Sequence, residues 1–233
     1  MSDFSHKRGT ELMRDSYREQ LDDILADLVH MSQVVSSAVR TATTALLEAD
    51  IHLAEQVISD DEKIDRKQSE VEARAFSLLA RQAPVAGELR TLVATLRMVT
   101  ELERMGDLAA HVAKIARLRY PEVAVPASLR ANFVRMGDVA EKMVVTAGQT
   151  LNDRNIQNAQ ELRSRDEEMD ELRRTQFRLL LSDDWNDGVE AAVDVALLGR
   201  YYERIADHAA SMARRIIYVV TGEFPEDEFW PQP

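Results

Sequence analysis

The feature that most constrains the fold of this chain is a largely apolar stripe that runs for about seven helical turns without a proline or glycine. Its positions lie three or four residues apart and are Leu21, Leu25, Leu28, Ser32, Val35, Val39, Ala42 and Leu46. An α-helix turns by about 100° per residue, so these side chains share one face. They predict a single long helix over residues 11–49 that buries one of its sides.

Five further helical segments show the same spacing. They are expected at residues 51–81, 89–118, 128–150, 155–181 and 187–221. The breaks between them contain residues that turn or interrupt a helix: Asp50 can cap the second helix, and Pro84 and Gly87 end it. Asparagine, aspartate and glycine occupy the last two connections, where they favour turns. The chain is therefore predicted to be all-α.

The two halves of the chain repeat each other. The segment DEKID at 61–65 parallels DEEMD at 166–170, and ERMGD at 103–107 parallels ERIAD at 203–207. Two ordered matches at offsets of 105 (166 − 61) and 100 (203 − 103) indicate an internal duplication. The predicted architecture is two tandem three-helix bundles, one at residues 8–119 and one at 128–222. A linker with two prolines at 120–127 joins them, and an irregular acidic tail follows at 223–233.

Each repeated motif carries two acidic residues four positions apart. That spacing places the two side chains about 40° apart on one helix face and about 6 Å apart along the axis. Antiparallel neighbours in one bundle can then bring four carboxylates together, and a bound cation would offset their repulsion. The candidate metal ligands are Asp61, Asp65, Glu103 and Asp107 in the first half and Asp166, Asp170, Glu203 and Asp207 in the second.

Carboxylate ligands suit hard or borderline cations such as Mg²⁺, Mn²⁺ and iron. His111, four residues beyond Asp107, is a candidate additional ligand, and Ser211 takes that place in the second half. The alternative interpretation is that the acid pairs are solvated helix faces. Basic residues that could then pair with them are Arg66, Lys67, Arg104 and Arg204.

Composition excludes several classes of protein. The chain has no cysteine, which rules out disulfides, thiolate metal sites and cysteine nucleophiles. Its net charge of −12 and its lack of clustered lysine and arginine argue against nucleic-acid binding. It contains no phosphate-binding loop or nucleophile elbow. Because it also lacks a signal peptide and a long uncharged run, we expect a cytoplasmic protein.

The positions of the histidines argue against one class of enzyme. A ferritin-like di-iron oxidase needs two Glu-x-x-His repeats, and no glutamate stands three residues before His30, His52, His111 or His208. Histidine phosphotransfer through His30 or His111 stays open. So does a metal-dependent enzyme or a metal-storage bundle, which is the main alternative to a non-catalytic protein.

The four motifs DEKID, DEEMD, ERMGD and ERIAD, in two tandem halves over about residues 11–221, resemble the PhoU family of cytoplasmic regulators of phosphate uptake. The resemblance implies two bundles related by a pseudo-twofold axis. It also implies multinuclear metal sites on the acidic faces, with iron or zinc in some members, at the eight acids named above. The chain departs mildly from the family pattern, with His111 and Ser211 where asparagine is common and Met169 in place of isoleucine.

The resemblance further implies a non-enzymatic role. Family members dampen the phosphate-starvation response by linking the Pst phosphate transporter, with its ATPase, to a sensor histidine kinase. We therefore predict a negative regulator of phosphate uptake and of that two-component response, with bound Fe, Zn, Mn or Mg ions. Long amphipathic helices also favour a homodimer, and contact with the membrane is expected only through partners. The tail offers Phe229 and Trp230 as a further contact for a partner.

Overall fold

The computed structural model describes residues 2–82, 84 and 86–223, and within these ranges it contains helices and no strand. The helices are α1 (Ser2–Glu48), α2 (Ile51–Gln82), α3 (Gly87–Arg119), α4 (Arg130–Asp153), α5 (Ile156–Leu180) and α6 (Gly188–Thr221), with a 3₁₀ turn η1 (Ala127–Leu129) before α4. The predicted all-α fold is confirmed. The tail residues Phe229 and Trp230 lie outside the described part of the chain.

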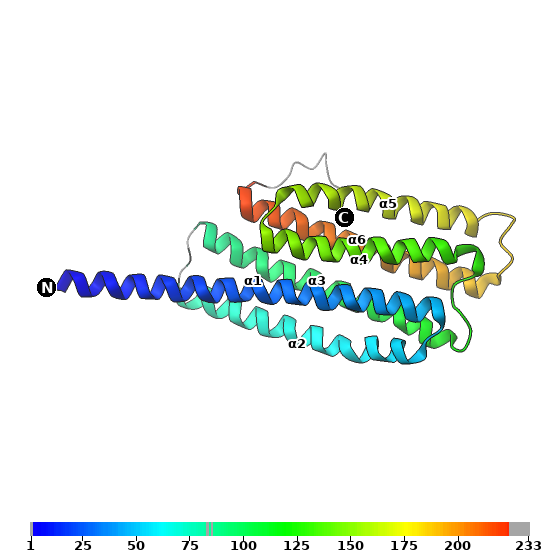
Figure 1. The fold of residues 1–233 in the computed structure, drawn as a ribbon, viewed down its shortest axis with the longest axis horizontal. Helices are drawn as coiled ribbons and strands as arrows, with labels where there is room; N and C mark the ends of the chain where they lie inside the picture. The colour runs from blue at the N-terminus through cyan, green and yellow to red at the C-terminus, as the bar shows by residue number, and fades with distance from the viewer. Residues whose placement is uncertain (1, 83, 85, 224–233) are drawn as a thin grey trace.

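Two helices differ in extent from the prediction. Helix α1 begins at Ser2 rather than at residue 11, because no proline interrupts the first ten residues. Its N-terminal part extends past the ends of the other helices (Figure 1). Helix α4 begins at Arg130, after the 3₁₀ turn, and continues to Asp153 rather than ending at residue 150.

Side chains cap the helices where the sequence predicts turns. Oδ1 of Asp50 accepts hydrogen bonds from the backbone N–H groups of His52 (2.9 Å) and Leu53 (3.0 Å), which closes the first turn of α2. The Asn155 side chain accepts from the backbone N–H of Gln157 (3.0 Å) at the start of α5. These caps allow the chain to reverse direction within two or three residues at both positions.

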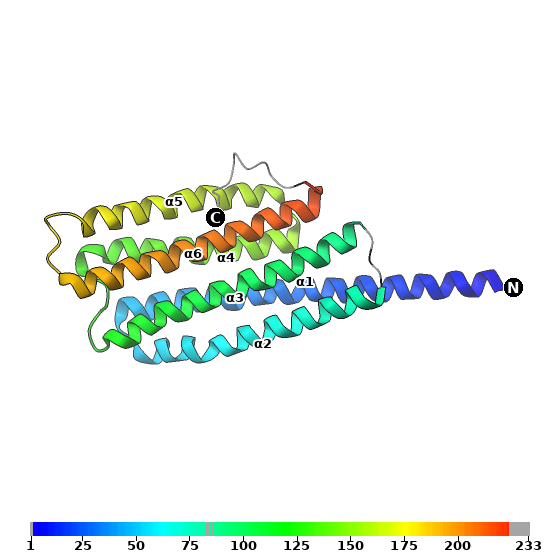
Figure 2. The same ribbon diagram turned by 180° about the vertical axis from the view of Figure 1, so that it is seen from behind.

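The six helices form two bundles that pack against each other. Helices α1, α2 and α3 contact one another, as do α4, α5 and α6, and the bundles meet through α1 with α4 and α3 with α6. Figure 2 shows α2, α3, α6 and α5 side by side in that order, with α1 and α4 behind them. The predicted pair of tandem three-helix bundles is confirmed. Within the described residues, no helix is both long and apolar enough to span a lipid bilayer.

The buried side chains of α1 reflect its position between the two bundles. The stripe on α1 is buried from Leu28 to Leu46, and Ile24 and Met31 are buried as well, because α1 packs against three helices. A polar contact between two buried side chains also joins the bundles. The hydroxyl of Tyr202 on α6 lies 2.8 Å from that of Thr43 on α1, which itself donates to a carbonyl of its own helix.

Candidate functional site

The structure brings the four predicted acids of the first half to the seam between α2 and α3. We call Asp61, Asp65, Glu103 and Asp107 the first acidic face. Partial burial, followed by the charges of Asp107 and Asp65, raises the pKa of Asp61 to about 6. Burial and Asp107 likewise raise the pKa of Glu103, with smaller contributions from the other two acids. The four carboxylates therefore lie close enough to repel one another.

A glycine sets the spacing of this seam. Gly106 lies between Glu103 and Asp107 on α3, and a Cβ at this position would be 2.8 Å from Cδ1 of Ile64 and 3.5 Å from Oδ1 of Asp61. A larger residue would push α2 away. The glycine in the ERMGD motif is thus what allows α2 to place Asp61 beside the acids of α3.

The acids of the second half gather in the equivalent place between α5 and α6. We call Asp166, Asp170, Glu203 and Asp207 the second acidic face. Asp166 is only 7% exposed, and its burial, followed by the charges of Asp207 and Asp170, raises its pKa to about 7. Burial raises the pKa of Asp207, and the negative charge of Glu203 raises it further.

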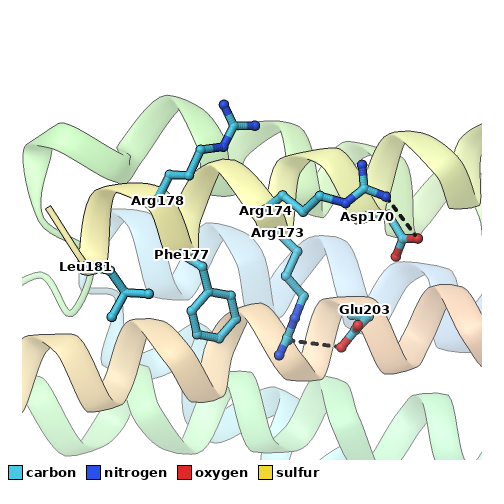
Figure 3. Close-up of a pocket in the computed structure, with 7 residues that line it drawn as sticks. All are labelled: Asp170, Arg173, Arg174, Phe177, Arg178, Leu181 and Glu203. Carbon is cyan, nitrogen blue, oxygen red and sulfur yellow. Dashed lines mark ion pairs between the residues drawn. The ribbon is translucent and has the colours of Figure 1, made fainter.

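Arginines occupy part of the second acidic face. Glu203 pairs with Arg173 of α5 at 3.0 Å and with Arg200 of its own helix at 2.5 Å, and Arg174 lies 3.7 Å from Asp170. Figure 3 shows Arg173 reaching from α5 down to Glu203 on α6. Asp170, Arg173, Arg174 and Glu203 line an open pocket of about 630 Å³.

Two further basic residues, which our sequence analysis did not identify, face the acids. Lys114 lowers the pKa of Asp61, and Arg214 lowers the pKa of Asp166. Both stand seven residues after the aspartate of their E-R-x-x-D motif and are therefore 100 positions apart (214 − 114). The repeat offset could have revealed them, had it been applied to basic as well as acidic residues.

His111 lies at the seam between the two halves. Its ring stacks on Tyr201 of α6, with ring centroids 5.3 Å apart and an interplanar angle of 27°. The repeat-equivalent contact is Ser211 with Glu101, where the serine hydroxyl donates to the carboxylate at 2.9 Å. The pairing of equivalent positions across this seam reflects the pseudo-twofold relation of the bundles. The role of His111 as an additional metal ligand stays a prediction.

Glu101 carries a cluster that sequence reasoning missed. Its side chain is 13% exposed, lies 2.7 Å from Nδ1 of His208 and accepts a hydrogen bond from Arg215 at 2.9 Å, in addition to that from Ser211. Burial alone would raise the pKa of Glu101, but these three partners outweigh it and lower the pKa to about 2. The cluster ties α3 to α6, and no local pattern in the sequence indicated it.

The donor groups of both faces fit a hard cation in their chemistry, but their side chains are not arranged around one. Among the described residues, no group of three or more acidic or histidine side chains is placed to hold a metal ion. Binding to either face would therefore require side-chain rotation, and on the second face also movement of the arginines. The residues that would hold the metal are the carboxylates of the two faces.

The fold and the paired acidic faces define a duplicated helical-bundle protein whose two repeats each present carboxylates along the seam of their second and third helices. The chain belongs to the PhoU family: the PhoU domain matches residues 28–116 and again residues 133–216. The two matches coincide with the two bundles of the structure.

Relatives and solved structures agree with this family. The chain is 47% identical over 219 residues to the phosphate-specific transport system accessory protein PhoU homolog 1 of Mycobacterium leprae, covering 94% of this chain and 99% of the relative. It is 47% identical over 213 residues to PhoU homolog 2 of Mycobacterium tuberculosis, covering 91% and 100%. The crystal structure of PhoU from Pseudomonas aeruginosa superimposes with a TM-score of 0.83 at 29% identity, covering 89% of this chain and 100% of that one.

Proposed function

We propose that this protein is a non-catalytic accessory protein of phosphate uptake that acts by binding partner proteins. The observation that carries the proposal is a sequence similarity. The chain is 47% identical, over nearly their full length, to relatives named as accessory proteins of the phosphate-specific transport system. In this proposal the protein represses uptake and the phosphate-starvation response in the cytoplasm, as a homodimer. Its partners are the ATPase of the transporter and a sensor histidine kinase.

The two acidic faces are proposed to bind metal. Their ligands would be Asp61, Asp65, Glu103 and Asp107 on one face and Asp166, Asp170, Glu203 and Asp207 on the other. The raised pKa values of Asp61 and Asp166 support this role, because burial and then the negative charge of neighbouring carboxylates raise them. A bound cation would compensate it and would hold the second and third helices of each bundle together.

The regulatory part is tested by gene deletion and complementation. In phosphate-rich medium, deletion should leave phosphate-responsive transcripts high, and the intact chain should restore repression. A variant with Arg66→Gln, an exposed residue whose Nε donates to the backbone carbonyl of Glu62, should restore it equally. Unchanged repression in the deletion strain would overturn the proposal.

The metal part is tested separately, by elemental analysis of protein purified without chelators. The intact chain should carry metal, and Asp107→Ala should reduce it. Absence of metal from the intact chain would overturn this part and leave the regulatory part standing. Turnover of dioxygen, or storage of many ions per chain, would instead support the alternative of a metal-dependent enzyme or storage bundle.

A further inference from the structure

The duplication allows the surroundings of the two acidic faces to be compared position by position. The middle helices α2 and α5 correspond at an offset of 105 and the last helices α3 and α6 at an offset of 100. Two basic residues occupy equivalent places on both faces. Arg104 corresponds to Arg204, and Lys114 corresponds to Arg214. These shared residues cannot explain a difference between the halves.

Three arginines of the second face have no basic counterpart on the first. Arg173, Arg174 and Arg200 correspond to Gln68, Ser69 and Thr100. The hydroxyls of Ser69 and Thr100 donate to backbone carbonyls of their own helices, at 3.1 Å each. The Gln68 amide donates to Glu72, at 3.2 Å. None of the three uncharged residues compensates an acid of the first face.

The arginines of the second face form ion pairs with two of its acids, Glu203 and Asp170. The Arg173 side chain is 18% exposed and spans from α5 to Glu203 on α6, where Arg200 approaches the same carboxylate. Its guanidinium also lies over the Phe177 ring, 5.0 Å from the centroid, which holds the side chain in this position. Arg174 lies 3.7 Å from Asp170, as Figure 3 shows, and also pairs with Glu171 of its own helix at 2.8 Å.

The balance of charge therefore differs between the faces. The four carboxylates of the first face interact with two basic residues, Arg104 and Lys114. The four carboxylates of the second face interact with five arginines, namely Arg173, Arg174, Arg200, Arg204 and Arg214, and with His208. Guanidinium groups stay charged at every pH that the folded protein experiences. A cation entering the second face would have to displace the ion pairs that Glu203 and Asp170 form with these arginines.

We propose that Arg173, Arg174 and Arg200 serve as the permanent cations of the second acidic face, so that this face takes no metal ion. This inference rests on the metal role proposed above for both faces and narrows it, because metal binding is then confined to the first acidic face. The two repeats, although built alike, would differ in chemistry: the first responds to metal availability and the second is held together independently of it.

The test uses Mn²⁺ and the full chain after removal of metal with EDTA. Bound Mn²⁺ per chain is measured by equilibrium dialysis with elemental analysis, and free Mn²⁺ by electron paramagnetic resonance. Asp61→Asn with Asp107→Asn should abolish binding, whereas Asp166→Asn with Asp207→Asn should leave it unchanged. Equal losses from the two double variants would overturn the inference.

Exchange of residues between the repeats gives a sharper test. The triple variant Arg173→Gln, Arg174→Ser and Arg200→Thr should bind twice the Mn²⁺ of the intact chain, since it gives the second face the neighbours of the first. The reverse variant, Gln68→Arg, Ser69→Arg and Thr100→Arg, should bind none. Circular dichroism melting of each variant confirms that it is folded.

The outcomes separate this inference from the metal proposal itself. If the intact chain binds no Mn²⁺, the metal proposal fails, and binding gained by the triple variant still supports the role of the arginines. If the triple variant gains no binding, the inference is overturned, whatever the intact chain does.

Discussion

Replacing Asp166 by asparagine should stabilise the protein at alkaline pH. Asp166 is 7% exposed, forms part of a group of four carboxylates, and has a pKa raised from 3.8 to about 7, chiefly by its burial and then by Asp207 and Asp170. A raised carboxyl pKa means that the folded state binds a proton more tightly than the unfolded state does. Ionising Asp166 therefore destabilises the folded protein, and asparagine removes that cost.

The size of the effect follows from the shift of the pKa. A change of about three pKa units corresponds to about 4 kcal/mol at a pH well above 7, and rearrangement of neighbouring charges reduces the observable part to about 2–4 kcal/mol. As the pH falls from 8 through 7 toward 4.5, Asp166 takes up a proton in the folded state. The advantage of Asp166→Asn should then shrink to below about 1 kcal/mol at pH 4.5.

The assay is urea unfolding followed by circular dichroism, at pH 8 and pH 4.5, with EDTA to remove metal. Glu167→Gln is the matched control, because Glu167 is the next residue on α5, is exposed, and pairs with Arg163 at 3.4 Å. It should change the free energy of unfolding by less than about 1 kcal/mol at either pH. An Asp166→Asn variant that is no more stable than the intact chain at pH 8, or equally stabilised at both pH values, would refute the reasoning.

Three further substitutions test the packing around the site, again by urea unfolding. Glu101→Ala should cost about 1–3 kcal/mol at pH 7, because it removes the partner of a partly buried histidine and arginine, and a cost below about 0.5 kcal/mol would contradict the structure. Gly106→Ala should cost about 1–3 kcal/mol through overlap with Cδ1 of Ile64. Adding Ile64→Val, which deletes that atom, should recover part of the loss, and no recovery would argue against the contact. Tyr202→Phe should cost about 1 kcal/mol by removing the hydrogen bond to Thr43, and a neutral result would show that this bond contributes nothing.

Much of the fold could be predicted because helix formation leaves a local signal. The spacing of apolar residues, together with Asp50 and the breakers Pro84 and Gly87, located the first three helices. Most of their ends were predicted to within a few residues. The exception is the start of α1, where no breaker marks a boundary and the helix continues to Ser2. The acids of both faces were also found in advance, since the duplication repeats them at constant offsets.

What could not be predicted depends on contacts between distant segments. No sequence pattern singled out Glu101, yet it joins residues more than one hundred positions away on α6. Likewise, nothing local to α5 indicates that Arg173 reaches across to Glu203. Side-chain pairing between helices depends on which faces pack together, and the sequence pattern of a single helix does not contain that information.

The sequence by itself determined that this chain forms six helices in two repeats, each with paired carboxylates on its second and third helices, because periodicity and repetition are written along the chain. Only the tertiary structure decided how the two acidic faces differ. Burial and the approach of neighbouring helices set the pKa of Asp166 and the ion pairs of Glu203, and both arise from distances that exist only after the helices have packed.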